Sequence, residues 1–132
     1  MRALVIDDSK TMRMIVSKIL RDGGFEVCEA IHGRAGLERL AETGPLDLVL
    51  VDWNMPEMNG FEFLLAVRAE RRFDDMRVMM VTTETEIEHM MQALEAGANE
   101  YVMKPFTKDG INEKLSLMGL QLVGADEWRA AA

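Results

Sequence analysis

The sequence lacks several features that would each indicate another class of protein. A single cysteine, Cys28, excludes an internal disulfide and predicts a reducing, cytoplasmic location. Basic residues are in the minority, with 15 lysines and arginines against a total of 23 aspartates and glutamates. The resulting net charge of −8 argues against nucleic-acid binding and against attachment to anionic membranes. No apolar run approaches the roughly 20 residues of a membrane span, so no membrane insertion is expected. Asp7 and Asp8 near the N-terminus exclude a signal peptide.

Short apolar runs alternate with stretches of helical periodicity along the chain. The apolar runs predict five strands, at Ala3–Ile6, Phe25–Cys28, Leu48–Val51, Val78–Val81 and Tyr101–Met103. Helices are expected over about Met12–Leu20, Arg34–Glu42, Gly60 to about Arg71, and Thr85–Glu95, with a fifth that starts near Thr107–Asp109. Strands that alternate with helices through short loops predict right-handed βαβ units, and therefore an α/β fold with a parallel sheet covered on both faces.

The composition of the strands predicts their order. Three of them are continuously apolar, which is typical of strands buried on both faces, whereas the second contains Glu26 and Glu29 and is expected at an edge. Five strands and five helices fit a doubly wound (βα)5 sheet of order 2-1-3-4-5, the known flavodoxin-like arrangement. We expect one domain over residues 1–119, followed by a short tail or helix extension over residues 120–132.

Four of the predicted strands end in polar residues. These residues are Asp7 and Asp8, Asp52, Thr82 and Thr83, and Lys104. In a parallel sheet all carboxyl ends lie on one edge, so these groups are expected to share one pocket. Three carboxylates that repel one another favour a hard divalent cation such as Mg²⁺, and a lysine and a hydroxyl beside it suit a phosphoryl group. A carboxylate can itself be the phosphoryl acceptor, and the central Asp52 is the best candidate.

Each of these residues taken alone has a simpler interpretation. Asp8 or Ser9 could cap the first helix, Thr82 or Thr83 could cap the fourth, and Lys104 could be a solvated surface charge. The joint pattern of four strand ends with complementary chemistry favours a site for phosphate and metal.

Four motifs then suggest a family. VIDDS, VDWNMPEMNG, VTTE and YVMKPF follow the first, third, fourth and fifth strands in that order. In this combination the chain, from about Arg2 to Met118, resembles the receiver domains of two-component response regulators, close to the single-domain chemotaxis (CheY-like) type. The resemblance implies a phosphoacceptor in signal transduction that catalyses its own phosphotransfer and dephosphorylation, and not a turnover enzyme. Its phosphoryl group would come from a phosphohistidine of a sensor histidine kinase or a histidine phosphotransfer protein.

The resemblance also implies a role for each residue beside Asp52, the phosphoacceptor. Asp8 and Asp52 would bind Mg²⁺ through their carboxylates and Asn54 through its backbone carbonyl, while Asp7 would hold a metal-bound water. Lys104, in a cis peptide with the next residue, would pair with the phosphoryl oxygens.

The switch residues implied by the resemblance are Thr82 and Tyr101. The Thr82 hydroxyl would swing onto the phosphoryl group, and Tyr101 would turn inward after it. This movement would remodel the face of helix 4, strand 5 and helix 5, through which a downstream protein is bound. Asn54 and Glu84 would tune the rate of phosphate loss, and the bulk of Thr83 would restrict access to the pocket.

Two further features concern the surface. The pairs Met79-Met80 and Met90-Met91 are each expected to contribute one core residue, with an adaptable partner surface as the alternative. A basic side of the first helix is expected to steer an acidic partner, or is simply solvated; its residues are Lys10, Arg13, Lys18 and Arg21.

Two other functional classes compete with this interpretation. An aspartate-nucleophile phosphohydrolase would carry a D-x-D pattern after its first strand, and here the aspartates are adjacent. A degenerate receiver that acts as a constitutive binding module would have lost an acid or the lysine. With no second domain expected, output would pass through protein contact, phosphotransfer or competition for a kinase, and the protein is expected to be a monomer. A flagellar switch, a kinase and another relay protein all remain open as targets.

Overall fold

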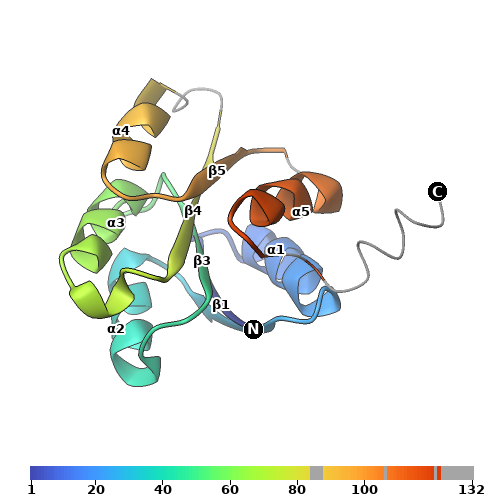
Figure 1. Ribbon diagram of the computed structural model, residues 1–132, viewed down its shortest axis with the longest axis horizontal. Coiled ribbons are helices and arrows are strands. Elements are labelled where there is room, and N and C mark those ends of the chain that lie inside the picture. Colours follow the sequence, from blue (N-terminus) through green and yellow to red (C-terminus); the bar gives the residue numbers. More distant parts are fainter. Residues whose placement is uncertain (84–87, 106, 121, 123–132) are drawn as a thin grey trace.

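The computed structural model describes residues 1–83, 88–105, 107–120 and 122. Its centre is a parallel sheet with helices on both faces (Figure 1). The strands are β1 (Arg2–Ile6), β2 (Glu26–Ala30), β3 (Leu48–Asp52), β4 (Arg77–Thr82) and β5 (Glu100–Met103). Their order is β2-β1-β3-β4-β5, so the predicted topology and the predicted edge position of the second strand are confirmed.

Two layers of helices cover the sheet. The helices are α1 (Lys10–Asp22), α2 (Gly33–Thr43), α3 (Gly60–Arg68), α4 (Met90–Glu95) and α5 (Lys108–Leu117), with a 3-10 turn, η1, at Arg71–Phe73. Helices α1 and α5 lie on one face, and α2, α3 and α4 lie on the other (Figure 1). Each layer closes its own apolar cluster against the sheet, so both faces are buried as the continuously apolar strands predicted.

Some predicted boundaries differ from those observed. Helix α3 ends at Arg68 instead of about Arg71, because the Arg68 guanidinium donates to the carbonyl oxygens of Phe73 and Met76, which come after the helix in the chain. A 3-10 turn follows the helix. Strand β2 starts one residue later than predicted and continues to Ala30, which pairs with Ile6 of β1. Residues 85–87 of the predicted fourth helix lie outside the described residues, and α4 as described covers Met90–Glu95.

The methionine pairs follow the two faces of the sheet. Met79 and Met80 are both fully buried, so the expectation of one core residue from this pair is wrong. Successive side chains of a strand point to opposite faces, and because both faces of β4 are covered, Met80 joins the α2–α3–α4 cluster and Met79 the α1–α5 cluster. In the second pair Met90 is buried and Met91 is 67% exposed, as predicted.

The last described residues fold back onto the α1–α5 layer. The chain turns at Gly119, whose φ of 82° lies in the left-handed region. Leu122 is fully buried, and its N–H donates to Asn112 Oδ1 at 3.0 Å. The remainder of the expected tail, residues 121 and 123–132, lies outside the described residues. Among the described helices, none combines the length and apolar character that crossing a bilayer requires.

Candidate functional site

Three carboxylates meet at the carboxyl edge of the sheet. Asp7 and Asp8 follow β1 and Asp52 ends β3, and these strands are hydrogen-bonded neighbours. One carboxylate oxygen from each residue lies within 4.8 Å of the other two. Asp7 and Asp52 are buried, with 5% and 6% of their surface exposed, and Asp8 is exposed. The sheet topology thus brings together the three acids that the strand-end pattern singled out.

Asp7 is held in place from three sides. Its Oδ1 accepts a hydrogen bond from the Ser9 N–H at 2.8 Å, its N–H donates to the Ala30 carbonyl at 3.2 Å, and its carbonyl oxygen accepts from Arg13 Nη1 at 2.7 Å. Ser9 Oγ in turn accepts from the Met12 N–H at 3.3 Å, so Ser9, one of the two candidate caps, is the N-cap of α1. The second Asp7 oxygen is directed at the cluster and its lysine.

Lys104 joins the cluster from the end of β5. Its Nζ lies 3.5 Å from Asp7 Oδ2 and 3.5 Å from Asp52 Oδ2, so one ammonium bridges two buried carboxylates. The Lys104-Pro105 peptide bond is cis, as the resemblance implied. The Lys104 N–H donates to the Thr82 carbonyl at 2.7 Å, which ties the end of β5 to the end of β4.

The charge balance of the cluster favours a cation. Burial, followed by the Asp7 charge, outweighs the opposing effect of Lys104, and the Asp8 charge adds a smaller increase; together these effects raise the pKa of Asp52 from 3.8 to about 6. One lysine therefore does not compensate the burial of Asp7 and Asp52 beside a third carboxylate, that of Asp8. Clustered carboxylate oxygens, two of them from buried residues, are the donors that Mg²⁺ prefers, so the residues present fit this ion.

The expected switch residues lie on β4 and β5. Thr82 is buried, and its hydroxyl donates to the Thr83 carbonyl at 3.1 Å, a backbone contact outside the acidic cluster. Tyr101 is half-buried on β5, directly opposite Met80 of β4 in the strand register. Asn54 is exposed two residues after Asp52. Glu84 lies outside the described residues.

Gly60, the predicted first residue of the third helix, shapes the loop after Asp52. A Cβ at Gly60 would come within 2.5 Å of the Asp52 carbonyl oxygen, so α3 can start this close to β3 only without a side chain here. The Gly60 N–H donates to the Trp53 carbonyl at 3.0 Å. Asn59 and Glu62 form a capping box that fixes the helix start, and the pattern N-x-x-E is the signal that could have revealed it.

Trp53, next to Asp52, connects this loop to α4. Its indole stacks on the His89 imidazole, with ring centroids 5.5 Å apart and planes inclined by 10°. Phe61 of α3 packs near the indole, with ring centroids 5.6 Å apart. Sequence patterns did not indicate this link, because the residues are far apart in the chain and each has an ordinary local role.

The basic side of α1 is largely paired. Glu29 of the edge strand lies 3.5 Å from Arg13 Nε and 3.5 Å from Arg21 Nη2, and Lys18 Nζ lies 3.0 Å from Asp22 Oδ2. Since these partners cancel much of the local charge, α1 presents less positive potential than its composition suggested.

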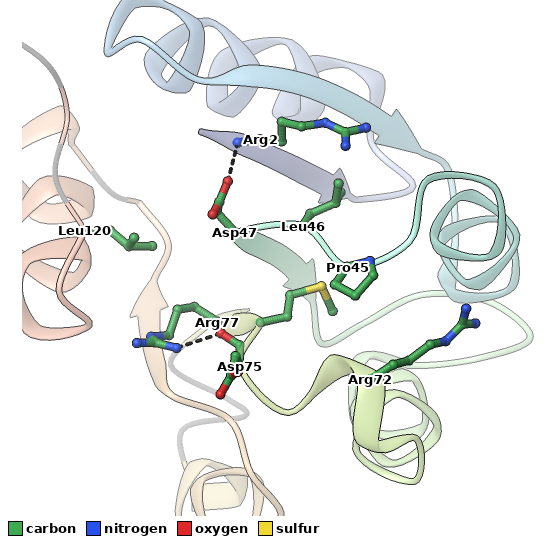
Figure 2. Close-up of a pocket in the computed structure, with 9 residues that line it drawn as sticks. Arg2, Pro45, Leu46, Asp47, Arg72, Asp75, Arg77 and Leu120 are labelled. Atoms are coloured by element: carbon green, nitrogen blue, oxygen red, sulfur yellow. Dashed lines mark hydrogen bonds between the residues drawn. The ribbon is translucent and has the colours of Figure 1, made fainter.

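A separate pocket of about 540 Å³ opens at the opposite, amino-terminal edge of the sheet. It is lined by Arg2, Pro45, Leu46, Asp47, Arg72, Asp75, Met76, Arg77 and Leu120 (Figure 2). Arg72 and Arg77 extend to different sides of it (Figure 2), and Arg77 Nη1 donates to the Asp75 carbonyl at 2.7 Å. None of the acids, hydroxyls or lysines discussed above lines this pocket, so it is no part of the acidic site.

The chain is similar to several known proteins. The family described as response regulator receiver domain matches residues 3–116. A chemotaxis protein CheY homolog of Campylobacter jejuni is 46% identical over 116 residues, 87% of this chain and 89% of the relative. Chemotaxis protein CheY1 of Helicobacter pylori is 43% identical over 119 residues, 89% of this chain and 96% of the relative. The structure of the chemotaxis response regulator CheY4 of Vibrio cholerae superimposes with a TM-score of 0.81 at 36% identity, covering 89% of this chain and 97% of that one.

Proposed function

Because the chain belongs to the response regulator receiver domain family, as a receiver of the CheY type, we propose that Asp52 is its phosphoacceptor. Receivers of this type are non-enzymatic signalling proteins that act between a phosphodonor and a downstream target. The observation that carries the proposal is the contact of Lys104 with Asp52: a buried acceptor carboxylate stands beside the cation that its phosphoryl group would need.

We propose that Asp8 and Asp52 hold Mg²⁺ through their carboxylates, together with the backbone carbonyl of Asn54, while Asp7 orients a metal-bound water. The bound ion would neutralise the charge shared by the carboxylates and the phosphoryl oxygens. The raised pKa of Asp52 and the spacing of the acidic oxygens support this assignment.

In the transfer step, an Asp52 carboxylate oxygen forms a P–O bond as the P–N bond of a donor phosphohistidine breaks. The Lys104 ammonium, which bridges Asp7 and Asp52, has only to pivot to meet a phosphoryl oxygen. Two strands and their hydrogen bonds fix both groups, so most of the contribution of the protein is positioning and charge stabilisation.

The proposed switch begins at Thr82. Its hydroxyl would donate to a phosphoryl oxygen instead of the Thr83 carbonyl oxygen, so only the hydrogen bond between Thr82 and Thr83 would have to break. Tyr101 would turn inward in response, and the surface of α4, β5 and α5 would change for a downstream protein. We assign the rate of phosphate loss to Asn54 and Glu84, with access restricted by Thr83.

We further propose that residues 1–119 carry this function in a cytoplasmic, monomeric, stand-alone regulator of chemotaxis or a related pathway. Its donor would be a sensor histidine kinase or a histidine phosphotransfer protein. The similarity to chemotaxis proteins over most of both chains supports the pathway. The target, whether a flagellar switch, a kinase or another relay protein, is not specified by the fold.

The direct test is the intact mass of the protein under acid after exposure to acetyl phosphate, with and without Mg²⁺. We expect one added phosphoryl group that requires Mg²⁺ and is absent from Asp52→Asn. Trp53 emission with beryllofluoride, which mimics a phosphoryl group, covers the case of a short-lived adduct. No adduct and no fluorescence response would leave a constitutive binding module as the better interpretation, and turnover of phosphate monoesters would favour a phosphohydrolase.

A further inference from the structure

Tyr101 lies under the ammonium of Lys114, a residue of α5. The Lys114 Nζ is 4.6 Å from the centroid of the Tyr101 ring, within the range of a cation–π contact. The strand that carries Tyr101 passes between α4 and α5 (Figure 1), so the ring belongs to the face through which the proposed switch would act.

Glu100 fixes the position of that ammonium. Its Oε1 lies 3.2 Å from Lys114 Nζ and also accepts a hydrogen bond from the Tyr101 N–H at 3.1 Å. One carboxylate oxygen therefore holds the lysine and, at the same time, the backbone of the residue over which the lysine lies. The three groups form a closed triangle of an ion pair, a backbone hydrogen bond and a cation–π contact.

This triangle differs from an ordinary surface ion pair. Exposed pairs lose most of their strength to water and to side-chain freedom. Here the side chains of Glu100 and Lys114 are only 18% and 29% exposed, and each makes more than one contact. Lys18 and Asp22 of α1, by contrast, form a pair that is 77% and 54% exposed.

We propose that Glu100 and Lys114 form a latch that holds the Tyr101 ring in the position seen here and thereby sets the threshold of the switch. The inference rests on the proposed function and adds a regulatory pair to it. When the ring turns inward it leaves the ammonium, while Lys114 stays with Glu100. The cation–π contact thus stabilises only one of the two ring positions, which is the condition for shifting a two-state equilibrium.

The size of the effect follows from that contact. A partly exposed cation–π contact changes an equilibrium by about two- to fivefold. If the inward ring is the minor state, loss of the latch raises its population by this factor and raises the apparent affinity for a phosphoryl mimic by the same factor. Both Glu100 and Lys114 are therefore positioning residues with no expected contact to the phosphoryl group.

The sequence offers a selective probe, because Tyr101 is its single tyrosine. The full chain labelled with 3-fluorotyrosine gives one ¹⁹F resonance that reports on this ring. Spectra are recorded for the wild type, Lys114→Met and Lys114→Arg, first without metal and then during titration with beryllofluoride and Mg²⁺. Lys108→Met is the matched control, since it removes an exposed lysine from the same helix.

We expect the metal-free Lys114→Met resonance to move toward the beryllofluoride-saturated position of the wild type, with a smaller H₂O/D₂O shift as the ring turns inward. Its half-saturating beryllofluoride concentration should fall about two- to fivefold. Lys114→Arg keeps a cation over the ring and should restore both values, and Lys108→Met should leave both unchanged. Glu100→Gln should give an intermediate result, because it keeps an acceptor for the Tyr101 N–H and loses the charge that holds the lysine.

Equal spectra and equal titrations for Lys114→Met and Lys108→Met would overturn the latch. So would a Lys114→Arg variant that behaves like Lys114→Met, since packing and not charge would then matter. If the wild type itself does not respond to beryllofluoride, the proposed function fails. The latch can still be tested in that case, because the metal-free H₂O/D₂O shifts of the variants report directly on the solvent exposure of the Tyr101 ring.

Discussion

The indole of Trp53 is stacked on the imidazole of His89, with 5.5 Å between the ring centroids. The stack joins the loop that follows Asp52 to the start of α4, two segments that are separated in the chain by α3, η1 and β4. A change at the acidic cluster thus has a direct aromatic contact through which it can reach α4.

Loss of this stack should be visible in fluorescence. The sequence has two tryptophans, so the measurement uses a Trp128→Phe background. His89→Ala exposes one face of the Trp53 indole to water, and we expect a red-shifted emission and a stability loss of roughly 0.5–1 kcal/mol. Gln92→Ala, an exposed change on the same helix, is the control. Identical emission maxima for the two variants would show that the stack does not shield the indole.

The buried Asp52 should make stability depend on pH in a defined direction. Its folded pKa of about 6 lies above the unfolded value of 3.8, so the folded state binds the proton more tightly. The resulting destabilisation is absent below pH 3.8, grows between 3.8 and 6, and is complete above 6. Two pKa units correspond to about 3 kcal/mol, an upper value for the gain on Asp52→Asn.

Urea unfolding with a chelator present, at pH 4 and pH 7.5, tests this dependence. Asp52→Asn should be more stable than the wild type at pH 7.5 and about equal to it at pH 4. A gain of the same size at both pH values would mean that the charge of Asp52 is not the cause. In the same window Mg²⁺ binding should weaken as the pH falls through about 6, because protons compete with the ion for Asp52.

Gly60→Ala should damage the loop at the acidic cluster. The added methyl group meets the Asp52 carbonyl oxygen at 2.5 Å, and backbone must shift to admit it. We expect a loss of about 1–3 kcal/mol in urea unfolding and weaker Mg²⁺ binding. Gly110→Ala is the matched control: its Cβ meets only Thr107 Oγ1, at 3.4 Å, and in a helix the change should stabilise by about 0.5–1 kcal/mol. Equal stability of the two variants would contradict the close approach.

Arg68 should be among the costliest side chains to remove. Its guanidinium donates to the carbonyl oxygens of Gly97, Phe73 and Met76 and to Asn99 Oδ1, at 2.7–2.9 Å. Burial lowers the pKa of Arg68 from its ordinary value, yet the charged form is the one that satisfies these acceptors. Arg68→Ala should cost about 3–5 kcal/mol, because partly buried carbonyls lose their donors.

Arg68→Lys should recover only part of that loss, since an ammonium cannot reproduce the planar fork of donors. Chemical denaturation of Arg68→Ala beside Arg72→Ala, a half-exposed arginine with one ion pair, separates this network from a general effect of arginine loss. Similar midpoints for the two variants would show that the four hydrogen bonds contribute little.

Periodic patterns predicted the elements of this fold well, because each strand and helix repeats a local rule. The acidic pair in the second strand marked its edge position, and the apolar strands marked burial on both faces. The acids and the lysine at the strand ends were found for the same reason: strand direction alone brings them to one edge.

Features that depend on long-range contacts were not predictable. The early end of α3 follows from Arg68, whose partners lie beyond the helix in η1 and around β4 and β5. The basic side of α1 looked free because its partner, Glu29, comes from the next strand. Local sequence contains no information about which distant carbonyl or carboxylate will face a given arginine.

The fold-back of Leu122 implies an evolutionary constraint. A Cβ at Gly23 would collide with the Leu122 side chain, so the C-terminal end of α1 needs a residue without a side chain where Leu122 packs against it. Asn112, buried on α5, keeps its acceptor for the Leu122 N–H. Homologues that replace this glycine by a larger residue should also differ at the positions of Leu122 and Asn112, and the three sites should therefore covary although they come from three separate segments of the chain.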